Sequence, residues 1–231
     1  MRVSTLAAAL FAPLAVWASP LPRTIDASSL QVLRESPRFF GSHSRRRRLT
    51  NLAFFFCQKN KIEFAFVLEN LETEFYSQGL SKFQPSDFLS AGFSSSDIAI
   101  SEISVIQVDE SVHVSAIQEL IVGFGETPLS TCTFDFSSVL VDVTTMVTVA
   151  QLVENVGVGA YLGAAHLVED PRVLTAAASI VTIESRHQTL LNLFQGNSLI
   201  PQSFDIPLLP NEVLAIAGGF IKGCDLGIKG T

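Results

Sequence analysis

The sequence predicts an all-α protein, a four-helix bundle with one long crossover between helices two and three. Four long stretches repeat apolar residues at the spacing of a buried helix face. Glycine, proline or capping residues mark the ends of these stretches. Each apolar face is also interrupted by ionisable side chains. Burying such groups unpaired is costly, so their presence indicates a site that they share.

The helix boundaries follow from these signals. Gly79 is expected to stop the first helix, and Asp170 with Pro171 caps and opens the fourth. The segment 80–96 supplies caps and one short helix. We therefore expect the four long helices at 62–78, at 97–122, at 143–165 and from Pro171 to Gly196.

The fourth helix carries the first pair of candidate ligands. Glu184 and His187 are three residues apart, so their side chains lie on one side of a helix. The other residues of that side are apolar, and include Ile180, Leu191 and Phe194. Two ionisable groups on a buried face need a common partner, and a metal ion is one such partner.

The other three predicted helices also carry ionisable residues on their apolar faces. Helix two repeats the Glu-x-x-His spacing, and helices one and three each carry an inward glutamate with a tyrosine seven residues later. This order of ligands is typical of carboxylate-bridged di-iron and di-manganese bundles. The predicted metal ligands are Glu69, Glu110, His113, Glu154, Glu184 and His187.

Helix one offers two glutamates. Glu69 and Glu72 are three residues apart and both can face inward. We choose Glu69 as the ligand, because its spacing to Tyr76 equals that of Glu154 to Tyr161, and keep Glu72 as a residue that supports the ligands. The two tyrosines either orient ligands by hydrogen bonds, pass electrons, or are ordinary half-buried core residues.

Two iron or two manganese ions are the expected cofactors. Carboxylates are hard oxygen donors, and neutral imidazole suits both metals. Four carboxylates neutralise two divalent ions and leave positions open for oxygen or peroxide. Glu110 and Glu184 are the candidates to bridge the ions. The competing hypothesis is a structural or protective protein with an empty bundle, in which these residues form a buried hydrogen-bonded network.

The start of the chain has the features of a secretory signal peptide. Residues 1–18 combine one basic residue, an apolar run and a cleavage site of small residues. The run is shorter than the roughly 20 residues that span a bilayer, and no later stretch is long and apolar enough. We therefore expect a soluble protein that is secreted, either extracellular or in the cell wall.

Residues 19–60 are expected to be a disordered segment before a folded domain at 61–231. Within it, residues 42–58 can be encoded by codons that contain splice signals. This permits the hypothesis that 42–58 is a short intron translated in frame. Transcript sequencing across the segment decides it.

Charge and cysteine content limit the partners and the compartment. Residues 1–60 contain 9 Lys and Arg against 2 Asp and Glu, whereas residues 61–231 contain 6 against 20. An acidic domain disfavours nucleic acid as a partner. In an exported protein Cys132 and Cys224 are expected to form a disulfide that joins the C-terminal tail to the crossover at 126–142. Cys57 is then left over, inside the doubtful 42–58 segment. The oligomeric state stays open.

The chain from about residue 61 to 224 resembles the secreted ferritin-like proteins of fungi known as stress-response or desiccation-related proteins. The strings that carry the resemblance are LENLETEFYSQGLSKF, VDESVHVSAI, LVENVGVGAYLGAA, LTAAASIVTIESRHQTLLN and NEVLAIAGGFIKGC. The resemblance implies a ferritin-like four-helix bundle, with the same six candidate metal ligands. It implies little about the reaction. Residues 42–60 depart from the family pattern.

Overall fold

The computed structural model describes residues 48–129, 131–224 and 226, with side chains from Lys61 onward. These residues are mostly helical, which confirms the all-α ferritin-like bundle. The signal-peptide prediction at 1–18 and most of the segment 19–60 lie outside the described residues. The elements in chain order are α2 (Arg48–Lys82), α3 (Pro85–Ser90), α4 (Ser96–Gly123), β1 (Thr133–Phe134), α5 (Val143–Ala165), α6 (Pro171–Phe194), α7 (Pro210–Ala217), the 3₁₀ turn η2 (Gly218–Phe220) and β2 (Ile221–Lys222).

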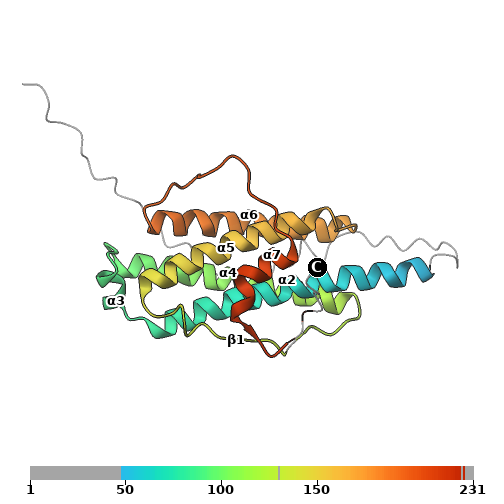
Figure 1. Ribbon diagram of the computed structural model, residues 1–231, viewed down its shortest axis with the longest axis horizontal. Coiled ribbons are helices and arrows are strands. Elements are labelled where there is room, and N and C mark those ends of the chain that lie inside the picture. The colour runs from blue at the N-terminus through green and yellow to red at the C-terminus, as the bar shows by residue number, and fades with distance from the viewer. Residues whose placement is uncertain (1–47, 130, 225, 227–231) are drawn as a thin grey trace, which may run out of the picture. The chain divides into compact units, whose positions relative to one another are not determined.

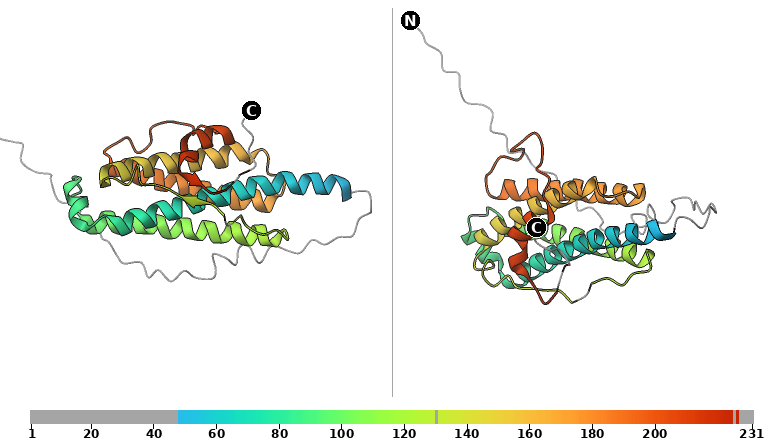
Figure 2. Two further views of the ribbon diagram at one scale, coloured as in Figure 1. Left: turned by 60° about the horizontal axis from the view of Figure 1, so that its bottom comes forward. Right: turned by 45° about the vertical axis from the view of Figure 1, so that its right-hand side comes forward.

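The four long helices form two packed pairs. Helix α2 packs along α4, α5 packs along α6, and contacts between α2 and α5 join the pairs (Figures 1 and 2). Side-chain caps fix three of the starts, because Ser95, Asp142 and Asp170 accept hydrogen bonds from the first turns of α4, α5 and α6. At the end of α6, Gly196 has a φ of 68°, which favours glycine. The predicted boundaries of these three helices agree within a few residues.

Helix α2 is longer than expected at both ends. It begins at Arg48, not near Ile62, and its first turns extend past the ends of the other helices (Figures 1 and 2). The segment from Arg48 to Asn60 contains neither glycine nor proline, so nothing in it breaks a helix. The part of the predicted disordered segment from Arg48 to Asn60 is therefore helical. The translated-intron hypothesis concerns the gene and stays a prediction.

Gly79 does not stop α2, contrary to the sequence prediction. It is buried within the helix, and a Cβ atom at this position would lie 2.5 Å from Cε of Met146 on α5. The glycine therefore permits close packing of α2 on α5. The helix ends instead at Lys82, shortly before Pro85, because a proline disfavours the helical conformation in the residue before it.

The C-terminal tail is attached to the crossover between the two helix pairs. Strands β1 and β2 pair antiparallel, with Thr133 opposite Lys222 and Phe134 opposite Ile221. Beside them Cys132 and Cys224, which are 92 residues apart in sequence, form the predicted disulfide. Val213 of α7 is fully buried in the main core, so the tail packs onto the bundle as expected.

The segment before α7 lies against α5 because two glycines of α5 leave room for it. The N–H of Leu208 donates a hydrogen bond of 2.9 Å to the carbonyl of Gly159. A Cβ atom on Gly163 would collide with the carbonyl oxygen of Leu208. These two glycines therefore admit a non-helical segment beside α5.

Within the described residues, no helix is both long and apolar enough to cross a membrane.

We predict that Gly163→Ala destabilises the fold by about 1–3 kcal/mol, because the added methyl group overpacks the contact with Leu208. Urea-induced unfolding measures the change in free energy. Gly123→Ala is the matched control, since a Cβ at Gly123 meets no atom within 4 Å and its φ is not positive. Equal stability of the two variants would contradict the role given to Gly163.

Candidate metal centre

The bundle buries an unusual set of ionisable side chains. Each is at most 8% exposed, and together they come from all four long helices. They are Glu69, Glu72, Glu110, His113, Glu154, Glu184 and His187. The structure therefore brings together all six residues that the sequence singled out as ligands, and adds Glu72 beside them.

These residues form two overlapping groups that could each hold one metal ion. The first consists of Glu69, Glu110, His113 and Glu184, and the second of Glu110, Glu154, Glu184 and His187. Within each group the candidate ligand atoms all lie within 4.8 Å of one another. Glu110 and Glu184 belong to both groups, which is the placement expected of bridging carboxylates.

Both histidines direct the same ring nitrogen into the cluster. Nδ1 of His113 lies 3.1 Å from an oxygen of Glu69, 3.1 Å from Glu110 and 3.2 Å from Glu184. Nδ1 of His187 lies 2.8 Å from Glu110 and 3.2 Å from Glu154. The two ring centres are 6.4 Å apart. Each Nδ1 thus meets the glutamates of its own group.

The two tyrosines connect the helix pairs crosswise. Tyr76 on α2 donates a 2.5 Å hydrogen bond to Glu154 on α5. Tyr161 on α5 donates a hydrogen bond to Glu69 on α2. Each hydroxyl therefore fixes the orientation of the lone glutamate on the opposite helix. Of the roles left open by the sequence, orienting the glutamates is the one that these contacts support.

Asp109 is a site residue that the sequence prediction missed. One of its oxygens lies 3.3 Å from Nε2 of His187, the ring nitrogen that points out of the cluster. A carboxylate in this position sets the tautomer and the orientation of a metal-binding histidine. The signal was present in the sequence, because Asp109 directly precedes Glu110, whereas Ile183 precedes Glu184.

Glu184 is the buried glutamate of the cluster whose two oxygens both lack a hydrogen bond. It is fully buried, and its Oε1 has an ion-pair contact of 3.2 Å with Nδ1 of His113. Gly157 makes room for it, since a Cβ atom there would lie 2.7 Å from one of these oxygens. A buried carboxylate without hydrogen bonds is strongly disfavoured, unless a cation binds it.

Burial and mutual repulsion raise the pKa values of several glutamates in the cluster, whereas His113 lowers the pKa of Glu69. Burial and the neighbouring Glu154 raise the pKa of Glu110 to about 8. Burial and Glu110 raise the pKa of Glu184 well above its usual range. For His187 burial acts in the opposite direction, but its contacts with Asp109, Glu110 and Glu154 raise the pKa to about 12.

The donor set fits a pair of transition-metal ions. Carboxylate oxygen and imidazole nitrogen together suit iron, manganese and zinc. Two cations would satisfy the excess negative charge, the unpaired Oε2 of Glu184 and the two Nδ1 atoms that both face Glu110.

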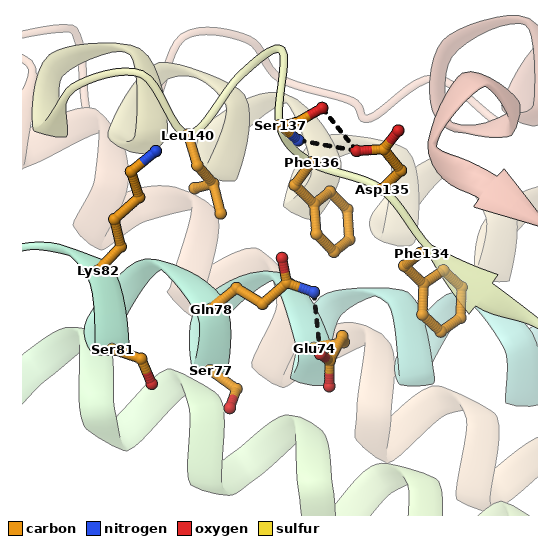
Figure 3. Close-up of a pocket in the computed structure, with 10 residues that line it drawn as sticks. All are labelled: Glu74, Ser77, Gln78, Ser81, Lys82, Phe134, Asp135, Phe136, Ser137 and Leu140. Atoms are coloured by element: carbon orange, nitrogen blue, oxygen red, sulfur yellow. Dashed lines mark hydrogen bonds between the residues drawn. The ribbon is translucent and has the colours of Figure 1, made fainter.

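A groove elsewhere on α2 is separate from this cluster. It has a volume of about 530 Å³ and lies between the outer face of α2 and the crossover. Phe134 and Phe136 of the crossover, together with Glu74 and Gln78 of α2, are among the residues that line it (Figure 3). None of the six candidate ligands lines the groove, so it is not part of the cluster.

A sequence model of the ferritin-like domain matches residues 59–197. This range contains α2 from Lys59 onward, all of α4, α5 and α6, and the six candidate ligands. This match decides the family. The chain belongs to the ferritin-like domain family. A comparison with curated proteins finds no match.

Family membership of this ferritin-like protein agrees with the arrangement of its helices and with the buried cluster. It does not identify a metal or a reaction. Metal binding by Glu69, Glu110, His113, Glu154, Glu184 and His187 stays a prediction, whereas their close approach in the core is an observation.

We predict that the metal-free protein loses stability as the pH rises from about 5 to 9. The raised pKa values of Glu110, Glu184 and His187 mean that the folded state keeps protons that the unfolded state releases above pH 4.5 for the glutamates and 6.5 for the histidine. Thermal unfolding in the presence of a chelator measures this dependence.

Bound metal should reverse the trend, because metal binding displaces protons and strengthens with pH. The control is Glu184→Gln, which removes one raised pKa and should flatten the dependence of the metal-free protein. A metal-free melting temperature that increases from pH 5 to 9 would contradict the prediction.

Proposed function

We propose that this ferritin-like protein holds two iron or two manganese ions and performs redox or metal-handling chemistry with oxygen, peroxide or the metal itself. Glu69 with His113, and Glu154 with His187, would each bind one ion. Glu110 and Glu184 would bind both. The assignment follows the two overlapping groups of ligand atoms.

The observation that carries this proposal is the state of Glu184. Among the described residues its Oε2 has neither a hydrogen bond nor an ion pair, and its Oε1 has only the 3.2 Å contact with His113, at the point where the two groups overlap. A protein that used these residues only as a structural network would be expected to pair such a carboxylate. A bridging ligand needs those oxygens free for two cations.

The chain would contribute orientation and exclusion of water. When bound, two such ions supply one-electron oxidation and reduction, and open positions for small oxygen species. Tyr76 and Tyr161 hold Glu154 and Glu69 in place by hydrogen bonds, and Asp109 holds the ring of His187. Since the side chains of His113 and His187 are only 10% and 6% exposed, the closed site suits small reactants.

We further propose that the protein acts outside the cell, in the secretome or cell wall, in a response to stress such as desiccation. Two features support export. Residues 1–18 have the sequence features of a signal peptide, and Cys132 is joined to Cys224. Structural disulfides persist mainly in oxidising compartments. The link to stress rests on the resemblance to the fungal stress-response proteins.

The alternative is a non-catalytic protective or structural protein with an empty bundle. One observation favours it, because the histidines and tyrosines already pair with several of the buried glutamates without any metal. This alternative leaves Oε2 of Glu184 unexplained, because among the described residues that oxygen has no hydrogen-bond or ion-pair partner.

The deciding experiment is the metal content of the purified protein. We expect about two iron or manganese ions per chain in the wild type, and loss of both in the double variant Glu184→Ala/His187→Ala. The matched control is Glu119→Ala/His166→Ala, which removes an exposed glutamate and an exposed histidine. A folded wild type that takes up no metal, even with iron added anaerobically, would establish the empty bundle instead.

We also predict that Asp109→Asn lowers the affinity for the metal by about 10- to 100-fold, because Nε2 of His187 loses its carboxylate partner. A titration with Mn²⁺ followed by electron paramagnetic resonance measures the change. Asp97→Asn, at the exposed start of the same helix, is the control. Unchanged affinity in Asp109→Asn would show that this contact does not position the ligand.

A further inference from the structure

The two helix pairs contribute to the cluster in nearly the same way. Each pair supplies a lone glutamate, a tyrosine seven residues later and a Glu-x-x-His motif. The tyrosines reach across to the opposite lone glutamates, and the histidines present the same nitrogen. The site therefore has an approximate two-fold repeat, in which α2 corresponds to α5 and α4 to α6.

Glu72 breaks this repeat. It is three residues after Glu69, and the position three residues after Glu154 is Gly157. One helix therefore contributes an additional carboxylate where its counterpart contributes no side chain. Glu72 is only 2% exposed, so the additional carboxylate is held inside the core.

Gly157 and Glu72 meet at the cluster. A Cβ atom built on Gly157 would lie 3.2 Å from one oxygen of Glu72 and 2.7 Å from one oxygen of Glu184. Two carboxylates from different helices thus occupy the space that the missing side chain leaves. One of them is Glu184, and its Oε2, the oxygen nearest to Gly157, has no hydrogen-bond partner.

Burying a fifth carboxylate costs free energy of folding unless a cation or a hydrogen-bond donor compensates its charge. Glu72 is only 2% exposed and one of its oxygens lies beside Gly157 together with an oxygen of Glu184, so its carboxylate has lost water and has another carboxylate nearby. A neutral or apolar residue would avoid that cost, as glycine does at the equivalent position of α5. A cation shared with Glu184 would offset it.

We propose that Glu72 is a seventh ligand of the metal pair, which binds beside Glu184 in the space left by Gly157; this inference rests on the proposed metal site. Four carboxylates balance two divalent ions, so a fifth leaves one excess negative charge. The centre is then best matched to a pair in which one ion is trivalent. Glu72 would therefore favour the more oxidised state of the pair.

The test uses Co²⁺ as the probe, because its visible absorption reports the number of ligands. We expect wild-type protein to bind two Co²⁺ ions, and Glu72→Gln to bind them at least about tenfold more weakly, with a changed spectrum. Glu74→Gln is the matched control, since Glu74 is an exposed glutamate on the same helix. It should keep the affinity and the spectrum of the wild type.

A second variant approaches the same site from α5. Gly157→Ala places a methyl group where the oxygens of Glu72 and Glu184 now lie, and should weaken Co²⁺ binding in the same way. A crystal structure of Co²⁺-loaded wild type decides the matter without any variant, since an oxygen of Glu72 is expected within bonding distance of an ion.

The outcomes separate this inference from the proposed function. If wild type binds two Co²⁺ ions and Glu72→Gln keeps the same affinity and spectrum, the ligand role of Glu72 is wrong and the metal pair stands. If wild type binds no Co²⁺, iron or manganese, both are wrong.

Discussion

The structure depends on one electrostatic constraint, the burial of five glutamates and two histidines in the core of a helical bundle. Carboxylates this close repel one another, and the apolar surroundings weaken the screening that water would provide. Protons, imidazolium groups or metal cations are the available sources of compensation. Histidine contacts supply part of it, including one to Oε1 of Glu184, but Oε2 of Glu184 has no hydrogen-bond partner. The cluster is thus more acidic than its own hydrogen bonds can satisfy, and this excess is the basis of the proposed metal site.

The rest of the fold can be understood as support for that cluster. Side-chain caps fix the residues at which α4, α5 and α6 begin. The glutamates and histidines of these helices meet in one cluster. Helix α5 has the central place, since Gly157 faces the carboxylates while Gly159 and Gly163 receive the segment that leads to α7. The β1–β2 pair and the disulfide then attach that tail to the crossover. A rigid outer layer helps to hold ligands in place when their mutual repulsion would separate them.

Sequence patterns predicted much of this arrangement, because a helix converts spacing into direction. The i, i+3 pairs, the glutamate–tyrosine spacing and the apolar periodicity were sufficient to place the six residues in one core. Patterns within one helix could not show contacts between helices. For that reason the sequence missed Asp109 beside His187, and treated Gly79 as a helix stop when Met146 of another helix requires a glycine there. The early start of α2 was missed because composition suggested disorder where no residue breaks a helix.

The departures from two-fold symmetry are as informative as the repeat itself. Asp109 contacts His187, while the corresponding position before Glu184 is Ile183 and offers no carboxylate. Likewise, Glu72 on α2 adds a carboxylate, whereas the equivalent position on α5 is Gly157, which has no side chain. A bundle that needed only a balanced buried network would gain nothing from these differences, since each adds negative charge to one side. Two metal positions with unequal surroundings can differ in affinity and in preferred oxidation state. Such inequality supports the proposed redox centre over the alternative of a purely structural bundle.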